Sequence, residues 1–325
     1  MNSVIVSICM ITYNHEKYIA KAIDSVIMQK TKFDYEIVIG EDCSTDKTRE
    51  IVLEYKAKYP DKIKLLLQEK NVGMMQNFID TLKACSGKYI ALLEGDDYWI
   101  DPYKLQKQVD FLEANEEYGL VHSDCDFYYQ EKKIWLYKAN KNLVNHLKEY
   151  TRQELFNYII DADYKIRTAT VLFRKSLLSH SERDYVVFEM GDTPLWLIFS
   201  QLTKFKYFNE VSAVYRIIPN SVSRSRNKII RLKFQLSMAE MRIHYSKRFG
   251  YPIKKSLMKR YNEALLLFKL YDPEYKEKYP LFEPTKYENF KLNKMKLVIF
   301  RYYFIIEWRM VNYINRLFEW IRKKY

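Results

Sequence analysis

The stretch VIVSICMIT, residues 4–12, is a continuous run of apolar and β-branched side chains, which is typical of a strand buried on both faces. The chain then alternates between helical and extended patterns. Strands are predicted at 4–12, 35–39, 63–67, 89–93 and 120–126, and helices at 16–29, 48–59, 75–84 and 105–112. Such alternation predicts an α/β fold, with a mostly parallel sheet flanked by helices and connected by right-handed crossovers.

Residues 1–223 are predicted to form one domain, because no Ser-, Pro- or Gly-rich linker interrupts them. The alternation loosens after Thr151, and the remaining elements are a helix at 152–160, a strand at 169–173, a helix at 194–202 and a strand at 207–218. Residues 224–325 form a C-terminal region with helical patterns at 229–249, 253–270 and 292–324.

Charge divides the chain at the same place. Of the net +13, residues 224–325 contribute 25 Lys and Arg against 9 Asp and Glu, whereas residues 1–223 hold 29 against 32. The chain is therefore a slightly acidic body with a strongly basic last third, and not a protein that is basic over its whole surface.

The predicted strand ends are polar, and in a parallel sheet ligands bind beyond the carboxyl ends of the strands. Two of the ends are rich in carboxylates. The side chains in question are Thr12, Tyr13 and Asn14 after the first strand, Glu41, Asp42, Ser44 and Asp46 after the second, Asn71 and Gly73 after the third, and Glu94, Asp96 and Asp97 after the fourth. We interpret this edge as a binding site.

The strongest local signal is LLEGDDYW, residues 92–99. Three carboxylates so close together cannot all stay ionised without a partner. A hard divalent cation resolves the repulsion, and such cations bind carboxylate oxygens together with substrate phosphates. The alternative is a solvated acidic turn, which the second acidic strand end makes less attractive.

Several other chemistries are excluded by the composition. The chain has only seven glycines and neither a GxGxxG nor a GxxxxGK[ST] pattern, so it lacks a glycine-rich phosphate loop. Its four cysteines have no CxxC spacing, which predicts free thiols in a reducing compartment. Its five histidines lack zinc-ligand spacing, and no GxSxG elbow is present.

Five motifs in order carry a resemblance to a known family: Thr12-Tyr13-Asn14, Gly40-Glu41-Asp42 with Ser44 and Asp46, Asn71-x-Gly73, Glu94-Gly95-Asp96-Asp97-Tyr98-Trp99, and Asp101-Pro102-Tyr103-Lys104-Leu105. Over roughly residues 3–223 the chain resembles a family 2 glycosyltransferase of the bacterial cell-surface polysaccharide type. The resemblance implies the A-type nucleotide-sugar-binding fold, a Rossmann-like sheet flanked by helices.

The resemblance also implies roles at the donor site. Thr12 and Tyr13 would lie against the nucleotide, Asp42 would read the base and Ser44 would approach the ribose. The segment Glu94-x-Asp96 with Asp97 corresponds to the family's Asp-x-Asp metal segment, with Mg²⁺ or Mn²⁺ as the ion. The full implied donor-binding set is Thr12, Tyr13, Asn14, Glu16, Asp42, Ser44, Asn71, Gly73, Asp96 and Arg216, and the implied metal ligands are Glu94, Asp96 and Asp97.

The family places a general base on an aspartate ahead of a later helix, and Glu189-Met190-Gly191-Asp192-Thr193-Pro194-Leu195-Trp196 matches that segment. Asp192 would deprotonate the acceptor hydroxyl, and an in-line displacement would invert the anomeric centre. The structural alternative makes Asp192 the N-cap of the helix opened by Pro194. Glu189 is the substitute candidate for the base.

For three further residues the sequence leaves open both a role in the site and a purely structural role. Arg216 either faces the diphosphate or forms a structural ion pair, and the histidine that many family members carry near Ile218 is absent. Arg167 and Thr168 either line the acceptor pocket or pack at the edge of the core.

The last predicted helix is basic and amphipathic, with Leu297, Phe300, Phe304 and Trp308 near one face. It would either rest on an anionic membrane or pack on the catalytic domain. The sequence shows no signal peptide or spanning segment, which predicts a cytoplasmic protein or one peripheral at the inner face of the plasma membrane.

The function predicted is that of an inverting, metal-dependent hexosyl- or N-acetylhexosaminyltransferase. It would move a sugar from a nucleoside-diphosphate sugar, most simply a UDP-sugar, to a hydroxyl of a glycan or lipid-linked acceptor. The alternative is a non-catalytic nucleotide- or nucleic-acid-binding protein that uses the basic region, but that region lacks a nucleic-acid-binding motif, so no nucleic acid is expected. The oligomeric state does not follow from the sequence.

Overall fold

The structure is a computed structural model of the 325-residue chain. It describes residues 4–140, 149–161, 165–180, 188–218, 227–269 and 271. The predicted amphipathic helix at 292–324 lies outside the described residues.

Residues 6–92 form the parallel part of the sheet, in the strand order β3-β2-β1-β4. The strands have the bounds β1 Val6–Thr12, β2 Tyr35–Glu41, β3 Ile63–Leu67 and β4 Tyr89–Leu92. All four run in the same direction, so their carboxyl ends meet at one edge of the sheet. The predicted α/β architecture is confirmed here.

Beyond β4 the sheet is mixed. The order continues β8-β6-β9-β5, with β7 paired to β6 off this path. β6 runs parallel to β9, whereas β8 is antiparallel to both β4 and β6, and β5 is antiparallel to β9. The bounds are β5 Tyr98–Trp99, β6 Tyr118–Tyr129, β7 Ile134–Leu136, β8 Leu172–Arg174 and β9 Lys204–Ile217.

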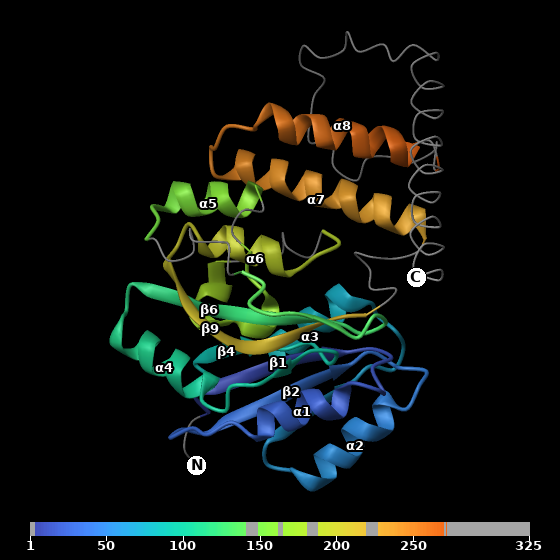
Figure 1. The fold of residues 1–325 in the computed structure, drawn as a ribbon, viewed down its shortest axis with the longest axis vertical. Helices are drawn as coiled ribbons and strands as arrows, with labels where there is room; N and C mark the ends of the chain where they lie inside the picture. The colour runs from blue at the N-terminus through green and yellow to red at the C-terminus, as the bar shows by residue number, and fades with distance from the viewer. Residues whose placement is uncertain are drawn as a thin grey trace, which may run out of the picture. The chain divides into compact units, whose positions relative to one another are not determined.

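Helices cover both faces of the sheet, as Figure 1 shows. One face packs against α1 and α2, where Ile8, Met10 and Ile37 contact the apolar side of α1. The opposite face, with Cys9 and Val38, packs against α3, α5 and α6. The helices are α1 Ile19–Ile27, α2 Thr48–Lys58, α3 Met74–Ala84, α4 Lys104–Ala114, α5 Arg152–Asp161 and α6 Asp192–Phe199. Alternate residues of β1 thus face different cores, as its uninterrupted apolar run predicts.

One predicted strand, 169–173, is only half correct. Residues Thr168–Thr170 form a 3₁₀ turn (η2), and only Leu172–Arg174 pair as β8. The Thr170 hydroxyl and amide both donate to the Arg167 carbonyl, at 2.8 and 2.9 Å. The Trp99 indole also donates to the Ala169 carbonyl at 2.7 Å. These bonds satisfy the turn's backbone locally, so it does not join the sheet.

The basic last third begins with two helices, α7 Lys228–Arg248 and α8 Lys255–Lys269. α7 contacts α6, and Met241 and Tyr245 belong to the same apolar cluster as α5 and α6. By contact density α7 and α8 fall within one compact unit, Met1–Lys276. The change of charge at residue 224 therefore does not coincide with a change in packing, and the predicted domain division stays a prediction. Among the described helices, none is long and apolar enough to cross a membrane.

Candidate active site

The loops after β1 and β2 are joined by hydrogen bonds between side chains and backbone. Asn14 has a φ of 55°, and its side-chain oxygen accepts from the Thr45 amide at 2.8 Å. The Asn14 amide donates to the Ser44 hydroxyl at 3.0 Å. Glu16 donates its amide to Asp46 at 3.0 Å and accepts from the Lys47 amide at 3.2 Å. Asn14, Glu16 and Ser44, all predicted site residues, are thus brought together and fixed in one place.

Asp42 holds the next loop in position. Its two carboxylate oxygens accept from the backbone amides of Val72 and Gly73, at 2.7 and 3.0 Å. Gly73 has a φ of 88° and is the N-cap of α3. The bonds place Asn71 and Gly73 beside the end of β2. The predicted contact between Asp42 and a base stays a prediction.

Glu41, the neighbouring carboxylate, has a structural role. It is fully buried, forms an ion pair with Arg49 and accepts from the Ser44 amide at 2.7 Å. Arg49 in turn donates to the Gln68 carbonyl at 2.6 Å. The acidic pair at the end of β2 therefore serves to shape the loops.

The segment after β4 lies against the end of β1. Gly95 donates its amide to the Ile11 carbonyl at 3.0 Å. A Cβ on Gly95 would lie 2.7 Å from the Thr12 hydroxyl and 3.0 Å from the His15 ring. Only glycine therefore lets the acidic segment approach Thr12 so closely. Tyr13, next to Thr12, is exposed at this edge.

Glu94 and Asp97 are carboxylates with an unsatisfied oxygen each. Within the described part of the chain, Glu94 Oε2 and Asp97 Oδ2 are buried and have no hydrogen-bond partner. Burial and the charge of Asp96 raise the pKa of Glu94 to about 7, against a hydrogen bond from Thr168 that lowers it. Burial and the charges of Asp96 and Glu94 raise the pKa of Asp97 well above its usual value. Such oxygens are suited to receive a positive charge.

Arg216 is a buried part of this cluster. Its amide donates to Asp97 Oδ1 at 2.7 Å and its guanidinium to the Asp96 carbonyl at 2.8 Å. The guanidinium carbon lies 4.6 Å from the Tyr98 ring centre and 5.1 Å from that of Tyr18. Arg216 was named from the sequence and Tyr98 was part of the 94–99 motif, but the contact of either tyrosine with Arg216 was not predicted.

Lys21 adds a second cation that sequence reasoning missed. Its ammonium lies 3.7 Å from the centre of the Tyr98 ring, on the same ring as Arg216. Partial burial and the charge of Arg216 lower its pKa. Two cations beside the acidic segment form a place suited to a polyanionic group.

Asp192 is the first residue of α6, and its N-cap is Gly191. The alternative that makes Asp192 the N-cap is therefore wrong. Asp192 Oδ1 accepts from the Thr193 amide at 2.6 Å, and burial raises the pKa of its carboxyl. Its charge also raises the pKa of Glu94, so the structure brings the predicted base and the acidic segment into one electrostatic site.

Glu189, the substitute candidate for the base, faces elsewhere. Its carboxylate pairs with Lys233 of α7 at 2.7 Å, and its amide donates to the Ser237 hydroxyl at 3.0 Å. These contacts anchor the segment before α6 to α7.

Arg167 is close enough to Asp192 for its charge to lower the pKa of that carboxyl, although burial raises it more. The guanidinium stacks on Phe127 and Tyr215, with centre distances of 5.0 and 5.6 Å. Its Nε is buried and has no partner among the described residues. The aromatic contacts show core packing at Arg167, and its predicted place in an acceptor pocket stays a prediction.

The carboxylates after β4 fit a divalent cation that takes some of its ligands from the substrate. Among the described side chains, no group of three His, Cys, Asp or Glu forms a preformed ligand set. Mg²⁺, however, is commonly held by one or two carboxylates plus substrate phosphates. The unsatisfied oxygens of Glu94 and Asp97 provide such a pair.

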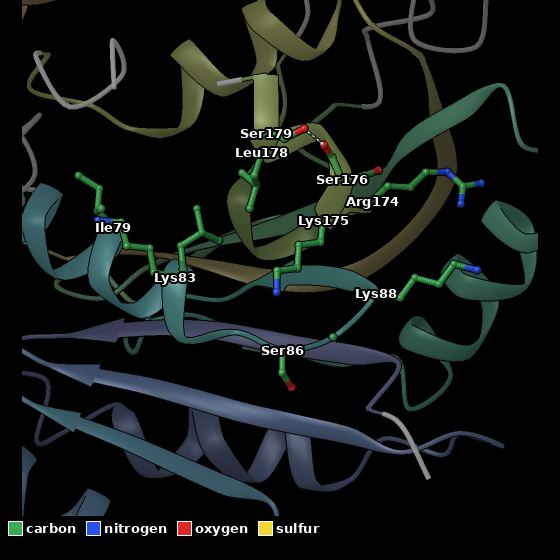
Figure 2. A pocket seen from close by; sticks show the side chains of 11 residues that line it. Ile79, Lys83, Ser86, Lys88, Arg174, Lys175, Ser176, Leu178 and Ser179 are labelled. Carbon is green, nitrogen blue, oxygen red and sulfur yellow. Dashed lines mark hydrogen bonds between the residues drawn. The ribbon is translucent and has the colours of Figure 1, made fainter. Parts of the chain in front are cut away.

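A hollow of about 830 Å³ lies at the opposite edge of the sheet, before β4 and after β8 (Figure 2). Three of its basic side chains already have partners: Lys175 donates to the Cys85 carbonyl at 2.7 Å, and Lys88 pairs with Glu113. Arg174 donates to the Leu112 carbonyl at 2.6 Å. None of the predicted site residues lines it, so the candidate site is the polar edge and not this hollow.

The fold and the acidic edge define an α/β protein of the A-type glycosyltransferase architecture. Two solved structures share it: Staphylococcus aureus TarS 1–349 with UDP-GlcNAc (17% identity, TM-score 0.56, 82% of this chain and 80% of that one) and the Pyrobaculum calidifontis mannosyltransferase PcManGT with GDP-Man and Mn²⁺ (17%, TM-score 0.54, 84% and 72%). The family model "Glycosyl transferase family 2" matches residues 7–179, just over half of the chain. The chain therefore belongs to glycosyl transferase family 2.

Two curated relatives are similar to this chain over different spans. The Escherichia coli protein WfgD, named as a UDP-Glc:α-D-GlcNAc-diphosphoundecaprenol β-1,3-glucosyltransferase, is 28% identical over 73% of this chain and 86% of its own length. An uncharacterized Mycobacterium tuberculosis protein is 48% identical over 111 residues, 34% of this chain. That match spans about a third of the mycobacterial protein (32%).

Proposed function

We propose that this protein transfers a sugar from a nucleoside-diphosphate sugar to a hydroxyl of a glycan or lipid-linked acceptor in surface polysaccharide synthesis. The donor would be UDP-linked, the reaction inverting and the metal Mg²⁺ or Mn²⁺. The observation that carries the proposal is the pair of buried, unsatisfied carboxylate oxygens of Glu94 and Asp97 beside Asp192. WfgD, by its name, acts with UDP-Glc on a lipid-linked sugar, and PcManGT is described with Mn²⁺.

The donor half of the site would hold the diphosphate. Glu94, Asp96 and Asp97 would hold the cation, which when bound would neutralise charge on the departing diphosphate. Arg216 and Lys21, both in cation–π contact with Tyr98, would add positive charge near the diphosphate. A cation, rather than a glycine-rich loop, would thus perform the phosphate recognition.

The nucleotide base of the donor would be recognised beside Asp42. A carboxylate offers about four acceptor positions, and the Val72 and Gly73 amides occupy two of them. The remaining positions suit an N–H donor of a base, such as N3–H of uracil. Guanine presents N–H donors as well, so the choice of a UDP-linked donor is supported by the name of WfgD.

Asp192 would act as the general base. Burial raises the pKa of its carboxyl, which strengthens it as a proton acceptor. Its bond from the Thr193 amide fixes one oxygen and orients the other. With the acceptor on this side and the nucleotide leaving from the other, the displacement would invert the anomeric centre.

Thermal-shift measurements test the donor assignment. UDP and UDP-sugars with Mn²⁺ or Mg²⁺ should raise the melting temperature more than GDP, and more than either nucleotide with EDTA. A larger shift with GDP would contradict the choice of UDP. Turnover of UDP-sugars should follow, whereas binding without any turnover across acceptors would favour a non-catalytic nucleotide-binding protein.

A further inference from the structure

The hairpin of β6 and β7 carries four consecutive large apolar side chains that are all exposed. The exposed fractions are 54% for Ile134, 39% for Trp135, 40% for Leu136 and 62% for Tyr137. Single exposed apolar residues are ordinary, but a contiguous patch marks an interaction surface. In the described ranges no other segment exposes four such neighbours.

The hairpin lies on the same edge as the candidate site. In the sheet register Trp135 is opposite Tyr128, and Tyr128 is opposite Arg216. Arg216 donates to the Asp96 carbonyl, so only two strands separate the patch from the acidic segment. Whatever covers the patch will stand beside the site.

The patch occupies both faces of its strand. Trp135 and Tyr137 share one face, where Trp135 packs on Tyr128 with ring centres 4.6 Å apart. Ile134 and Leu136 point to the opposite face, because side chains alternate along a strand. A sugar ring would use the aromatic face alone and leave two exposed aliphatic residues without a role.

The charges around the patch are positive. Lys132, Lys133 and Lys138 flank it and are exposed. The acidic neighbours are Glu131 and the largely buried Asp126, which accepts from the Lys138 amide at 2.8 Å. A second copy docked on β7 would bring its own three lysines against these, which is unfavourable. An anionic surface is attracted instead.

We propose that the β6–β7 hairpin is a membrane-binding element that inserts into the interface of an anionic lipid leaflet. Trp and Tyr are the residues enriched at the headgroup level of membranes, and the aliphatic pair would enter the acyl boundary. The three lysines bind lipid phosphates. The hairpin thereby holds the edge that carries Asp97 and Arg216 close to the leaflet. The hairpin takes no part in the proposed sugar transfer. Lipid binding can therefore be measured without any sugar donor.

The test is co-sedimentation of the full-length protein with vesicles of phosphatidylcholine alone or mixed with phosphatidylglycerol. Leu136→Glu should weaken binding to anionic vesicles by about tenfold or more. Replacing Lys132 and Lys133 together by Ala should weaken it by about fivefold for each lysine. The matched controls are Leu53→Glu and Lys58→Ala on α2, where Leu53 is 45% exposed; both should bind as the natural chain does.

A second readout follows the hairpin itself. Vesicles should shift the tryptophan emission to shorter wavelength, and Trp135→Phe should remove most of that shift. Far-UV circular dichroism confirms that each variant is folded. Equal vesicle binding by the Leu136→Glu and Leu53→Glu variants would overturn the proposal. The proposal would also be overturned if the natural protein were a dimer that Leu136→Glu dissociates. The same holds if Trp135→Ala lost affinity only for a soluble glycan acceptor.

Discussion

The loops after β1 and β2 differ from the segments around β4 and η2 in how their polar side chains are paired. At the carboxyl ends of β1 and β2, the side chains of Asn14 and Asp42 accept from backbone amides, so the loops are fixed before any ligand arrives. Around β4 and η2, Asp97 Oδ2 and Arg167 Nε are buried without partners among the described residues. The loops after β1 and β2 form a preformed cradle, whereas the segments around β4 and η2 hold groups whose partners would be supplied by substrates. Each of the following predictions tests one side of that contrast.

The largest effect is expected at Asp192. Replacing Asp192 by Asn keeps the acceptor oxygen for the Thr193 amide but removes the proton acceptor. We expect kcat to fall by about 10²–10⁴-fold while nucleotide affinity stays nearly unchanged. Because burial raises the pKa of Asp192, activity of the natural protein should be lost as pH falls through a value above that of an ordinary aspartate.

The measurements are steady-state kinetics over a pH range and nucleotide titration by calorimetry. Glu189→Gln is the matched control, since Glu189 pairs with Lys233 and should leave kcat almost unaltered. Full turnover by the Asp192→Asn variant would exclude Asp192 as the base.

A substitution at Asp42 tests the preformed loops at the ends of β1 and β2. In Asp42→Asn, one oxygen that accepts from a backbone amide becomes an NH₂ group that faces an N–H donor. The 72–73 turn should loosen, with a loss of about 1–3 kcal/mol in the free energy of unfolding. UDP affinity should fall as well, because the same carboxylate would face the base.

Urea denaturation and UDP titration measure both effects. Asp61→Asn serves as the control, since Asp61 is exposed ahead of β3. If Asp42→Asn were as stable as this control, the donor cradle would not depend on Asp42.

The parallel and mixed parts of the sheet also differ in how far the sequence predicted them. The run at 4–12 and the polar strand ends placed β1 to β4 and their loops, because each such strand is buried on both faces and carries its own periodicity. The mixed part of the sheet was harder to predict from the sequence. β5 and β7 are two and three residues long, too short for a periodic signal, and η2 depends on the Trp99 indole, 70 residues away in the chain.

The candidate site divides in the same way. Asp96, Asp97 and Asp192 were predicted from local motifs, and the structure brings the acidic segment and Asp192 into one electrostatic site. The roles of Lys21, Tyr18 and Tyr98 were not predicted, because they depend on Arg216, which comes from the far end of the sheet. The alternation of the first half cannot reveal such contacts.

The smallest expected effect concerns a polar anchor in the mixed half. Lys104 is buried, donates to Gln108 at 2.8 Å and lies 4.4 Å from the Trp99 ring centre. Gln108 in turn donates to the Thr170 carbonyl of η2 at 2.9 Å. Burial lowers the pKa of Lys104 to about 7, so between that value and 10.5 the unfolded chain binds more protons than the folded one. Stability from this group should therefore rise with pH across that window.

Lys104→Met should abolish that rise and, near pH 7, stabilise the fold by roughly 1 kcal/mol, because a buried cation is replaced by an apolar chain of similar length. The gain stays small because Gln108 loses its donor. Thermal unfolding from pH 6 to about 10 should show the melting temperatures of the two proteins converging as the pH rises. Lys107→Met is the control: hydrogen bonds from Lys107 to Asp101 and Glu210 raise its pKa, so its loss should give no gain. A constant gap between Lys104→Met and the natural protein would show that Lys104 is charged throughout, and that η2 is anchored by an ammonium that stays protonated inside the core.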